Sequence, residues 1–152
     1  MRFERKYRIT LQSLAEVKQM LALHPAGFRE HHADRQVNNI YFDNTDLLTY
    51  HLNTSGVGSR KKYRVRWYGE NPSEIVNPIF ETKIKQNELG SKRLIPVQPF
   101  SLNKLSPLTE EVNQQNPDLI ALFPVLLNSY QRAYLISADG RYRATLDFNM
   151  QY

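Results

Sequence analysis

The residues of this chain with the clearest capacity for chemistry are cations that alternate with aromatic and aliphatic residues over positions 60–68. Successive side chains of a β-strand point to opposite sides, so every second residue shares a face. The cations on one face would be Lys62, Arg64 and Arg66. The apolar residues on the other would be Tyr63, Val65 and Trp67. If the apolar face packs on the protein, the cations must face solvent or a polar cavity with anionic contents.

The same alternation recurs in other segments, where one face is charged and the opposite face is apolar or aromatic. The charged positions are Glu4, Lys6, Lys62, Arg64, Arg66, Glu81, Lys83, Lys85, Arg132, Arg143 and Asp147. One such strand usually indicates a solvated sheet face, but five or more favour an antiparallel sheet closed around a charged interior. Cations ~4 Å apart repel by roughly 4 kcal/mol at an effective dielectric constant of about 20. This pattern therefore predicts a polyanionic ligand.

Short strands separated by turn residues must position these side chains, because the chain carries period-two segments and no internal repeat. We expect strands over residues 2–9, 37–42, 60–69, 79–85, 91–97, 130–136 and 141–147. A turn at 138–140 is expected to join the last two strands into a hairpin.

Helical signals lie between the strands. Ser13 and Glu16 have the spacing of a capping box, and they predict a helix over 13–23 that ends before Pro25. Asp43 or Asn44 would cap a short helix over 46–50. Residues 100–127 read as a helical excursion with fragments at 109–113 and 118–123. The His31-His32-Ala33-Asp34 segment is expected to be a loop, and Gly56-Val57-Gly58 a flexible turn.

The composition, with 41% hydrophobic and 23% charged residues in 152, is that of a soluble globular protein, and we expect a single domain over 1–152. The net charge of +5 favours polyanionic partners. The absence of cysteine excludes disulfides and thiolate metal sites. No apolar run approaches the ~20 residues of a membrane span, and the start lacks the apolar segment of a signal peptide. A cytoplasmic location is therefore expected.

Six motifs in order resemble those of a known family. They are Glu4-Arg5-Lys6-Tyr7, Asn39-Ile40-Tyr41-Phe42-Asp43, Lys62-Tyr63-Arg64-Val65-Arg66-Trp67-Tyr68-Gly69, Phe80-Glu81-Thr82-Lys83, Tyr130-Gln131-Arg132-Ala133-Tyr134 and Arg143-Ala144-Thr145-Leu146-Asp147. Together, over residues 2–147, they resemble the VTC domain, the polyphosphate polymerase module of the vacuolar transporter chaperone complex and its bacterial relatives. That family lies within the triphosphate tunnel metalloenzyme (CYTH-like) superfamily. The resemblance implies an α+β fold, an antiparallel β tunnel barrel with a basic interior and helices packed outside.

The resemblance also implies a function, the synthesis of polyphosphate from ATP with Mn²⁺ or Mg²⁺ on the triphosphate. The catalytic positions that it implies are Lys6, Arg64, Arg66 and Lys83. The phosphate-binding positions that it implies are Lys62, Lys85, Lys92, Arg93, Arg132 and Arg143, and the register leaves open whether Lys92 or Arg93 joins the others. These residue types suit phosphoryl transfer, which depends on positioning and charge neutralisation more than on covalent chemistry.

The sequence departs from the family in its metal ligands. In the family a later strand carries a metal-binding Glu and a companion Lys, in a stretch resembling Leu-Glu-Val-Lys that does not occur before Tyr152. We therefore expect a barrel without its final strand or strands and a chain truncated at its C-terminus. The remaining candidates for a metal site are Glu4, Glu81 and Asp147, whose oxygens suit Mg²⁺ or Mn²⁺. A salt bridge to a neighbouring cation is the alternative role for each.

Other functions stay open at this point. The missing metal-ligand strand favours a non-catalytic polyphosphate or triphosphate sensor, and the same tunnel would also suit a triphosphatase or a nucleotide cyclase. A nucleic-acid-binding domain is a further alternative, because aromatic and basic residues interleave over 60–68. Against it, Tyr63 and Trp67 point away from the face that carries the arginines.

Overall fold

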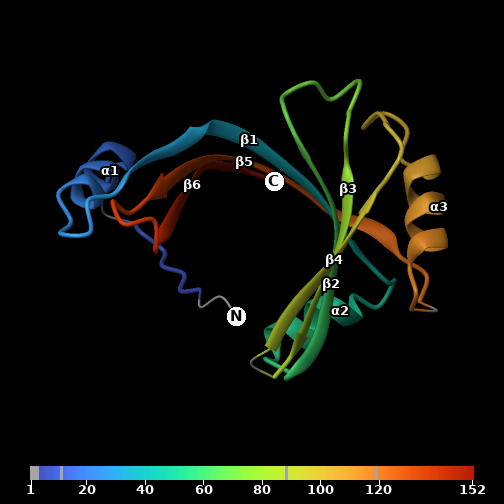
Figure 1. Cartoon of the computed structure of the whole chain (residues 1–152). Coiled ribbons are helices and arrows are strands. Elements are labelled where there is room, and N and C mark those ends of the chain that lie inside the picture. Colours follow the sequence, from blue (N-terminus) through green and yellow to red (C-terminus); the bar gives the residue numbers. More distant parts are fainter. Residues whose placement is uncertain (1–3, 11, 88, 119) are drawn as a thin grey trace. The chain divides into compact units, whose positions relative to one another are not determined.

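The structure is a computed structural model, in which residues 4–10, 12–87, 89–118 and 120–152 are described. Its helices and strands in chain order are α1 (Leu14–Ala22), β1 (Arg29–Asp43), α2 (Leu48–Thr54), β2 (Ser59–Tyr68), β3 (Ile79–Gln86), β4 (Leu89–Pro96), α3 (Ser106–Gln115), β5 (Phe123–Ile136) and β6 (Arg143–Gln151). They make an α+β fold whose antiparallel sheet has the order β4-β3-β2-β1-β5-β6 (Figure 1). The order is open, with β4 and β6 at its ends, so the described hydrogen bonds do not form the closed barrel expected from the resemblance.

The chain divides into two compact units. Unit 1 contains residues 1–34 and 132–148, and unit 2 contains residues 35–131 and 149–152. The long strands β1 and β5 contribute residues to both units.

Unit 1 begins with α1, and the capping box predicted from the sequence is confirmed. The Ser13 hydroxyl accepts a hydrogen bond from the Glu16 amide at 3.3 Å, and the Glu16 carboxylate accepts one from the Ser13 amide at 2.6 Å. Lys18 on this helix pairs with Glu30 at 3.7 Å and with Asp34 at 3.3 Å. The helix is therefore tied to the N-terminal half of β1.

The turn between β5 and β6 in unit 1 is also confirmed. The Ser137 amide donates to the Tyr142 carbonyl at 3.0 Å, and the Gly140 amide donates to the Ser137 carbonyl at 2.9 Å. Gly140 has a φ of +72°, a conformation that favours glycine. The hydroxyl of Ser137 closes the turn by donating to Asp139 at 2.6 Å.

Three expectations about secondary structure were wrong. Residues 4–9 of the first expected strand form no strand and are exposed, while residues 2 and 3 of that strand lie outside the described residues. The expected loop at 31–34 belongs to β1, which begins at Arg29. The expected helix at 118–123 is absent at the described positions 118 and 120–122, and β5 begins at Phe123.

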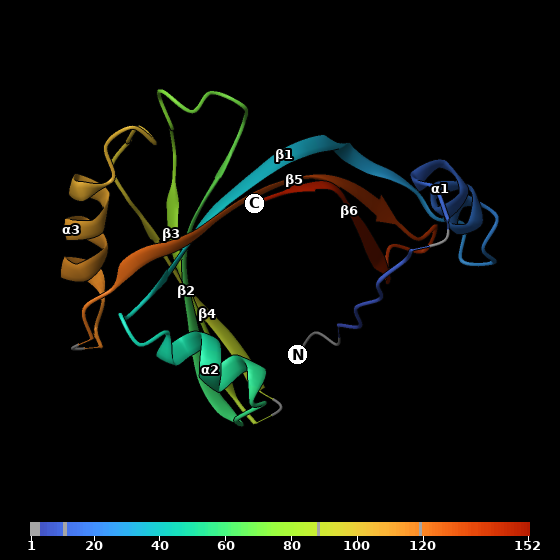
Figure 2. The ribbon, with the colours of Figure 1, turned by 180° about the vertical axis from the view of Figure 1, so that it is seen from behind.

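Unit 2 is built on β2, β3 and β4, which run side by side (Figures 1 and 2). β2 pairs with β1 on one side and with β3 on the other, both antiparallel. Its burial alternates as the sequence predicts, with Tyr63, Val65 and Trp67 at most 4% exposed. The alternation arises because one face of the strand packs in the core while the other carries the cations.

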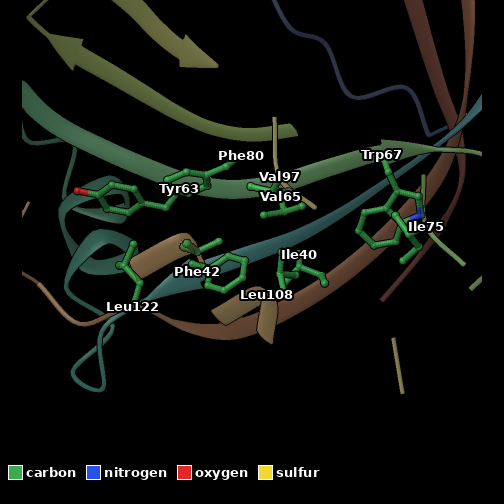
Figure 3. Close-up of a cluster of buried hydrophobic side chains, with 11 residues drawn as sticks. Ile40, Phe42, Tyr63, Val65, Trp67, Ile75, Phe80, Val97, Leu108 and Leu122 are labelled. Carbon is green, nitrogen blue, oxygen red and sulfur yellow. The ribbon is translucent and has the colours of Figure 1, made fainter. Parts of the chain in front are cut away.

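The core of unit 2 lies on this apolar face. Its buried hydrophobic residues are Ile40, Phe42, Tyr63, Val65, Trp67, Ile75, Phe80, Val97, Leu108, Val112 and Leu122 (Figure 3). Leu108 and Val112 come from α3, so this helix covers the sheet face opposite the cations. The ring of Trp67 meets the ring of Phe100 edge to face at 5.6 Å. The expected packing of a helix over the apolar face is confirmed in this unit.

Several polar groups at the edge of this core are paired. The Tyr63 hydroxyl donates to Asp118 at 2.6 Å, and the same carboxylate binds the ammonium of Lys61. At the start of α2, Asp43 accepts hydrogen bonds from the amides of Thr49 and Tyr50, both at 2.9 Å. Asn44 accepts one from the Leu48 amide at 2.8 Å, so both residues bind amides of the first turn. The helix begins at Leu48, two residues later than predicted, and Leu47 occupies the N-cap position.

A candidate anion-binding site on β2 and β3

Cross-strand pairing gathers most of the predicted cations of unit 2 on one face. Residues directly opposite each other in an antiparallel pair have side chains on the same side of the sheet. Tyr41 pairs with Arg64, and Arg64 pairs with Glu81. Asn39 pairs with Arg66 in the neighbouring row. The site is therefore built on regular strands, which hold side chains more rigidly than loops.

A row of three lysines crosses the same face. Lys62 pairs with Lys83 on β3, and Lys83 pairs with Lys92 on β4. Like charges directly opposite one another destabilise a sheet. An anion bound beside the row would reduce the repulsion between these lysines.

The register also separates the two neighbouring cations of β4. Arg93 pairs with Thr82, which is 3% exposed and lies on the face opposite to the lysine row. Lys92 is thus the β4 residue that lies with the other cations, and Arg93 lies away from them. Lys85 pairs with Arg60 and extends the basic face toward the end of the strands.

Arg64 is held by a carboxylate. Its Nε and Nη2 donate to Oε2 of Glu81 at 3.1 and 2.8 Å, and its Nη1 lies 3.4 Å from the Tyr41 hydroxyl. Burial alone would lower the pKa of Arg64, but the Glu81 carboxylate and Tyr41 raise it above its ordinary value. The Glu81 carboxylate is 9% exposed, so Arg64 and Glu81 form a nearly buried ion pair.

Arg66 is held by a neutral amide. Its Nε donates to Oδ1 of Asn39 at 2.9 Å, and its Nη2 lies 3.4 Å from the Tyr130 hydroxyl. Asn39 is fully buried and donates through Nδ2 to Oδ1 of Asn128 at 2.8 Å. In the part of the chain that the structure describes, no carboxylate lies within ion-pair distance of Arg66.

The remaining predicted residues lie in unit 1. Arg132 on β5 donates to both oxygens of Asp147 on β6, at 2.6 and 2.7 Å. Lys6 and Glu4 lie 3.7 Å apart in an exposed segment without regular secondary structure. Arg143 is exposed at the start of β6. These residues belong to unit 1, whereas Arg64 and Arg66 belong to unit 2.

His31, placed in a loop by the sequence, is an exposed residue of β1 in a basic setting. Its ring lies 3.9 Å from that of His32, centroid to centroid. Desolvation lowers the pKa of His31, and the neighbouring His32, Arg143 and Arg29 lower it further.

The carboxylates considered for a metal site are engaged with cations. Glu81 pairs with Arg64 and Asp147 with Arg132, while Glu4 lies beside Lys6. No group of three or more His, Asp or Glu residues suited to a metal ion occurs within the described ranges. The described carboxylates therefore do not by themselves form a three-ligand metal site.

Sequence reasoning missed the residues that orient the arginines. Asn39 and Tyr41 belong to a motif used for the resemblance, but their contacts with Arg66 and Arg64 become visible only with the β1 and β2 register. Asn128 and Tyr130 come from β5, far away in the chain. The sequence feature that could have indicated these residues is the alternation of side chains along β1, which places Asn39 and Tyr41 on one face.

Comparison with known proteins identifies the family of this chain. No curated protein matches the sequence. None of the helices in the described ranges is long and apolar enough to cross a membrane. The model of the VTC domain family matches residues 1–152, which is the whole chain. The chain therefore belongs to the VTC domain family, which suggests a function connected with polyphosphate and with polyphosphate or nucleotide ligands.

Proposed function

We propose that this domain binds polyphosphate and nucleoside triphosphate on the basic face of β2, β3 and β4, and extends polyphosphate by phosphoryl transfer. The observation that carries the proposal is the placement of Lys83, Lys92 and Arg66 on one face of the sheet. Lys83, Lys92 and Arg66 have no carboxylate within ion-pair distance among the described residues. Cations placed on one face without counter-charges favour a polyanionic ligand.

In the proposed reaction a terminal oxygen of the phosphate chain attacks the γ-phosphorus of ATP. The bond from the γ-phosphorus to the β,γ-bridging oxygen breaks, and this oxygen leaves with ADP while the chain grows by one phosphate. The residues of this chain would orient the triphosphate and neutralise its charge, which is most of what phosphoryl transfer requires of a protein. Arg66 suits forked contacts with phosphate oxygens, and Lys83 acts as a point charge.

A divalent metal would enter with the nucleotide in this proposal. Mg²⁺ usually keeps several waters and is bound by one or two carboxylates together with substrate phosphates. The described carboxylates do not form a full cage, and a nucleotide-borne Mn²⁺ or Mg²⁺ does not require one. Such a metal would supply charge neutralisation on the triphosphate. For the sheet, we also propose the enclosing tunnel of the family.

The experiment is an assay of chain growth. The protein is incubated with ATP and Mn²⁺, and phosphate chain length is followed by gel electrophoresis. Growth that Arg66→Ala abolishes and Lys104→Ala preserves would support the polymerase, because Lys104 is an exposed cation in the segment before α3. An absence of growth together with tight binding of tripolyphosphate would favour the sensor.

Release of orthophosphate or formation of a cyclic nucleotide in the same assay would indicate a triphosphatase or a cyclase. A nucleic-acid interface is not favoured. Tyr63 and Trp67, the aromatic residues that would stack on bases, are 2% and 4% exposed in the core of unit 2.

A further inference from the structure

The two arginines of β2 differ in the chemistry of the groups that hold them. Each donates through its Nε to a side chain of a neighbouring strand, Arg64 to Glu81 and Arg66 to Asn39. The tether of Arg64 carries a negative charge, whereas the tether of Arg66 is a neutral amide. A carboxylate both orients and neutralises a guanidinium, while an amide only orients it.

The amide of Asn39 is itself fixed in one orientation. Its Nδ2 donates to Asn128 at 2.8 Å, which leaves Oδ1 to accept from Arg66 at 2.9 Å. The side chain is fully buried, so water does not compete for either bond. A buried amide with both ends bonded holds its partner in one geometry.

The two tethers have opposite consequences for an anion. A phosphate chain that approaches Arg64 must compete with Glu81, which already accepts from two of its nitrogens. A phosphate chain that approaches Arg66 meets a positive charge with no carboxylate partner among the described residues. The full attraction of a charge-assisted hydrogen bond is available only at Arg66.

We propose that Asn39 is a positioning residue that makes Arg66 the main phosphate anchor, and that Glu81 restrains Arg64 from binding phosphate. The inference rests on the proposed function, because it assumes that this face binds polyphosphate. Beyond that function, it specifies which of the two arginines binds phosphate more strongly and which neighbouring side chains cause the difference. Polyphosphate affinity should therefore respond in opposite directions to changes at the two tethers.

The test measures tripolyphosphate binding by calorimetry in metal-free buffer, together with the melting temperature of each variant. Asn39→Asp gives Arg66 a carboxylate tether, and we expect the affinity to fall about tenfold, since ~1.4 kcal/mol corresponds to a factor of ten. The loss of the bond to Asn128 should also lower its melting temperature, so the opposite responses of affinity and stability are sought in the second variant. Glu81→Gln frees Arg64, and we expect the affinity to rise several-fold while the melting temperature falls. A purely structural role would make affinity follow stability in both variants.

Charge-matched controls separate local tethering from net charge. Asn103→Asp and Glu110→Gln make the same changes of charge at exposed positions before and within α3, on the side of the sheet opposite the cations. They should alter the affinity by less than about twofold if tethering is decisive, because exposed charges beyond a Debye length are largely screened. Asn38→Ala is the packing control, because the neighbouring Asn38 is 8% exposed and binds the Gly69 carbonyl instead of an arginine.

The outcomes distinguish this inference from the proposed function. Failure of the unaltered protein to bind tripolyphosphate overturns the proposed function. Binding that Asn39→Asp leaves unchanged, or that Glu81→Gln weakens, overturns the inference alone. If Asn39→Asp does not fold, the direction of the Glu81→Gln effect still decides it.

Discussion

The two faces of β2 differ in how their polar and charged side chains are paired. On the apolar face, Tyr63 and Lys61 both bind Asp118, and the surrounding side chains are buried. On the other face, the lysines of three strands lie opposite each other. One face is complete within the protein, while we propose that the other is stabilised by an external anion. The same strand thus separates the groups that stabilise the fold from those that would bind ligand.

The largest expected effect concerns the apolar face of β2, which packs in the core. Phe80→Ala removes a fully buried ring that packs 6.5 Å from Tyr63, centroid to centroid, and it should destabilise the fold by roughly 3–5 kcal/mol. Urea unfolding measures the change. Phe123→Ala, at a position 45% exposed, is the control and should cost far less. Equal losses at the two positions would contradict the placement of the core.

On the face that we propose to bind phosphate, the largest expected effect is at Arg66. Arg66→Ala should weaken tripolyphosphate binding by about 1.5–3 kcal/mol, the range for charge-assisted hydrogen bonds. Arg64→Ala should weaken it less, because Glu81 already neutralises that charge. Calorimetric titration of both variants at one ionic strength gives the comparison. A greater loss for Arg64→Ala would reverse the order that the tethers predict.

The hydrogen bond between Tyr63 and Asp118 allows a second test of the apolar face, in which the expected change in stability is smaller and depends on pH. Burial raises the pKa of the Tyr63 phenol, and its hydrogen bond to Asp118 raises it further. Hydrogen bonds from Lys61 and Tyr63 lower the pKa of Asp118 below its ordinary value. A carboxyl group whose pKa is lowered by folding stabilises the fold at pH values above its unfolded pKa of about 4. This stabilisation is lost as the pH falls through its folded pKa.

Asp118→Asn should therefore destabilise the fold by about 1 kcal/mol at pH 7. The difference from the unaltered protein should shrink as the pH falls below about 4, because the unfolded chain then takes up a proton at Asp118 more readily than the folded protein does. Denaturant unfolding across this pH range measures it. Tripolyphosphate affinity should stay unchanged at pH 7, and a marked loss of affinity would show that the two faces are not independent.

The sequence predicted the faces of β2 because a strand has a period of two and one of its faces is buried. It placed the helix over 13–23 correctly, since the capping box is a local signal. Residues 4–9 alternate equally well, yet a strand also needs hydrogen bonds from a neighbouring strand, which no local pattern supplies. The N-terminal half of β1 was missed because its residues are exposed on both faces.

Site residues were harder to predict where they depend on distant partners. Lys92 and Arg93 are adjacent and both positively charged, so residue type does not show which of them lies with the other cations. The pairing of Lys92 with Lys83 and of Arg93 with Thr82 decides it. Asn39 is an ordinary polar residue in the sequence, and its role comes from its contacts with Arg66 and with Asn128, 89 positions away. Tertiary pairing, and not residue type, decided these cases.

The smallest expected effect tests whether the lysine row costs stability without ligand. Lys83→Met removes the central charge of the row and keeps a side chain of similar length, so it should stabilise the free protein by a few tenths of a kcal/mol. The same change should weaken tripolyphosphate binding, because one cation facing the ligand is lost. Chemical denaturation without phosphate measures the first effect, and calorimetry measures the second. Arg93→Met removes a charge from the opposite face and should leave the affinity nearly unchanged. A loss of stability in Lys83→Met would mean that this row is already neutralised within the protein, and the contrast between the two faces would then fail.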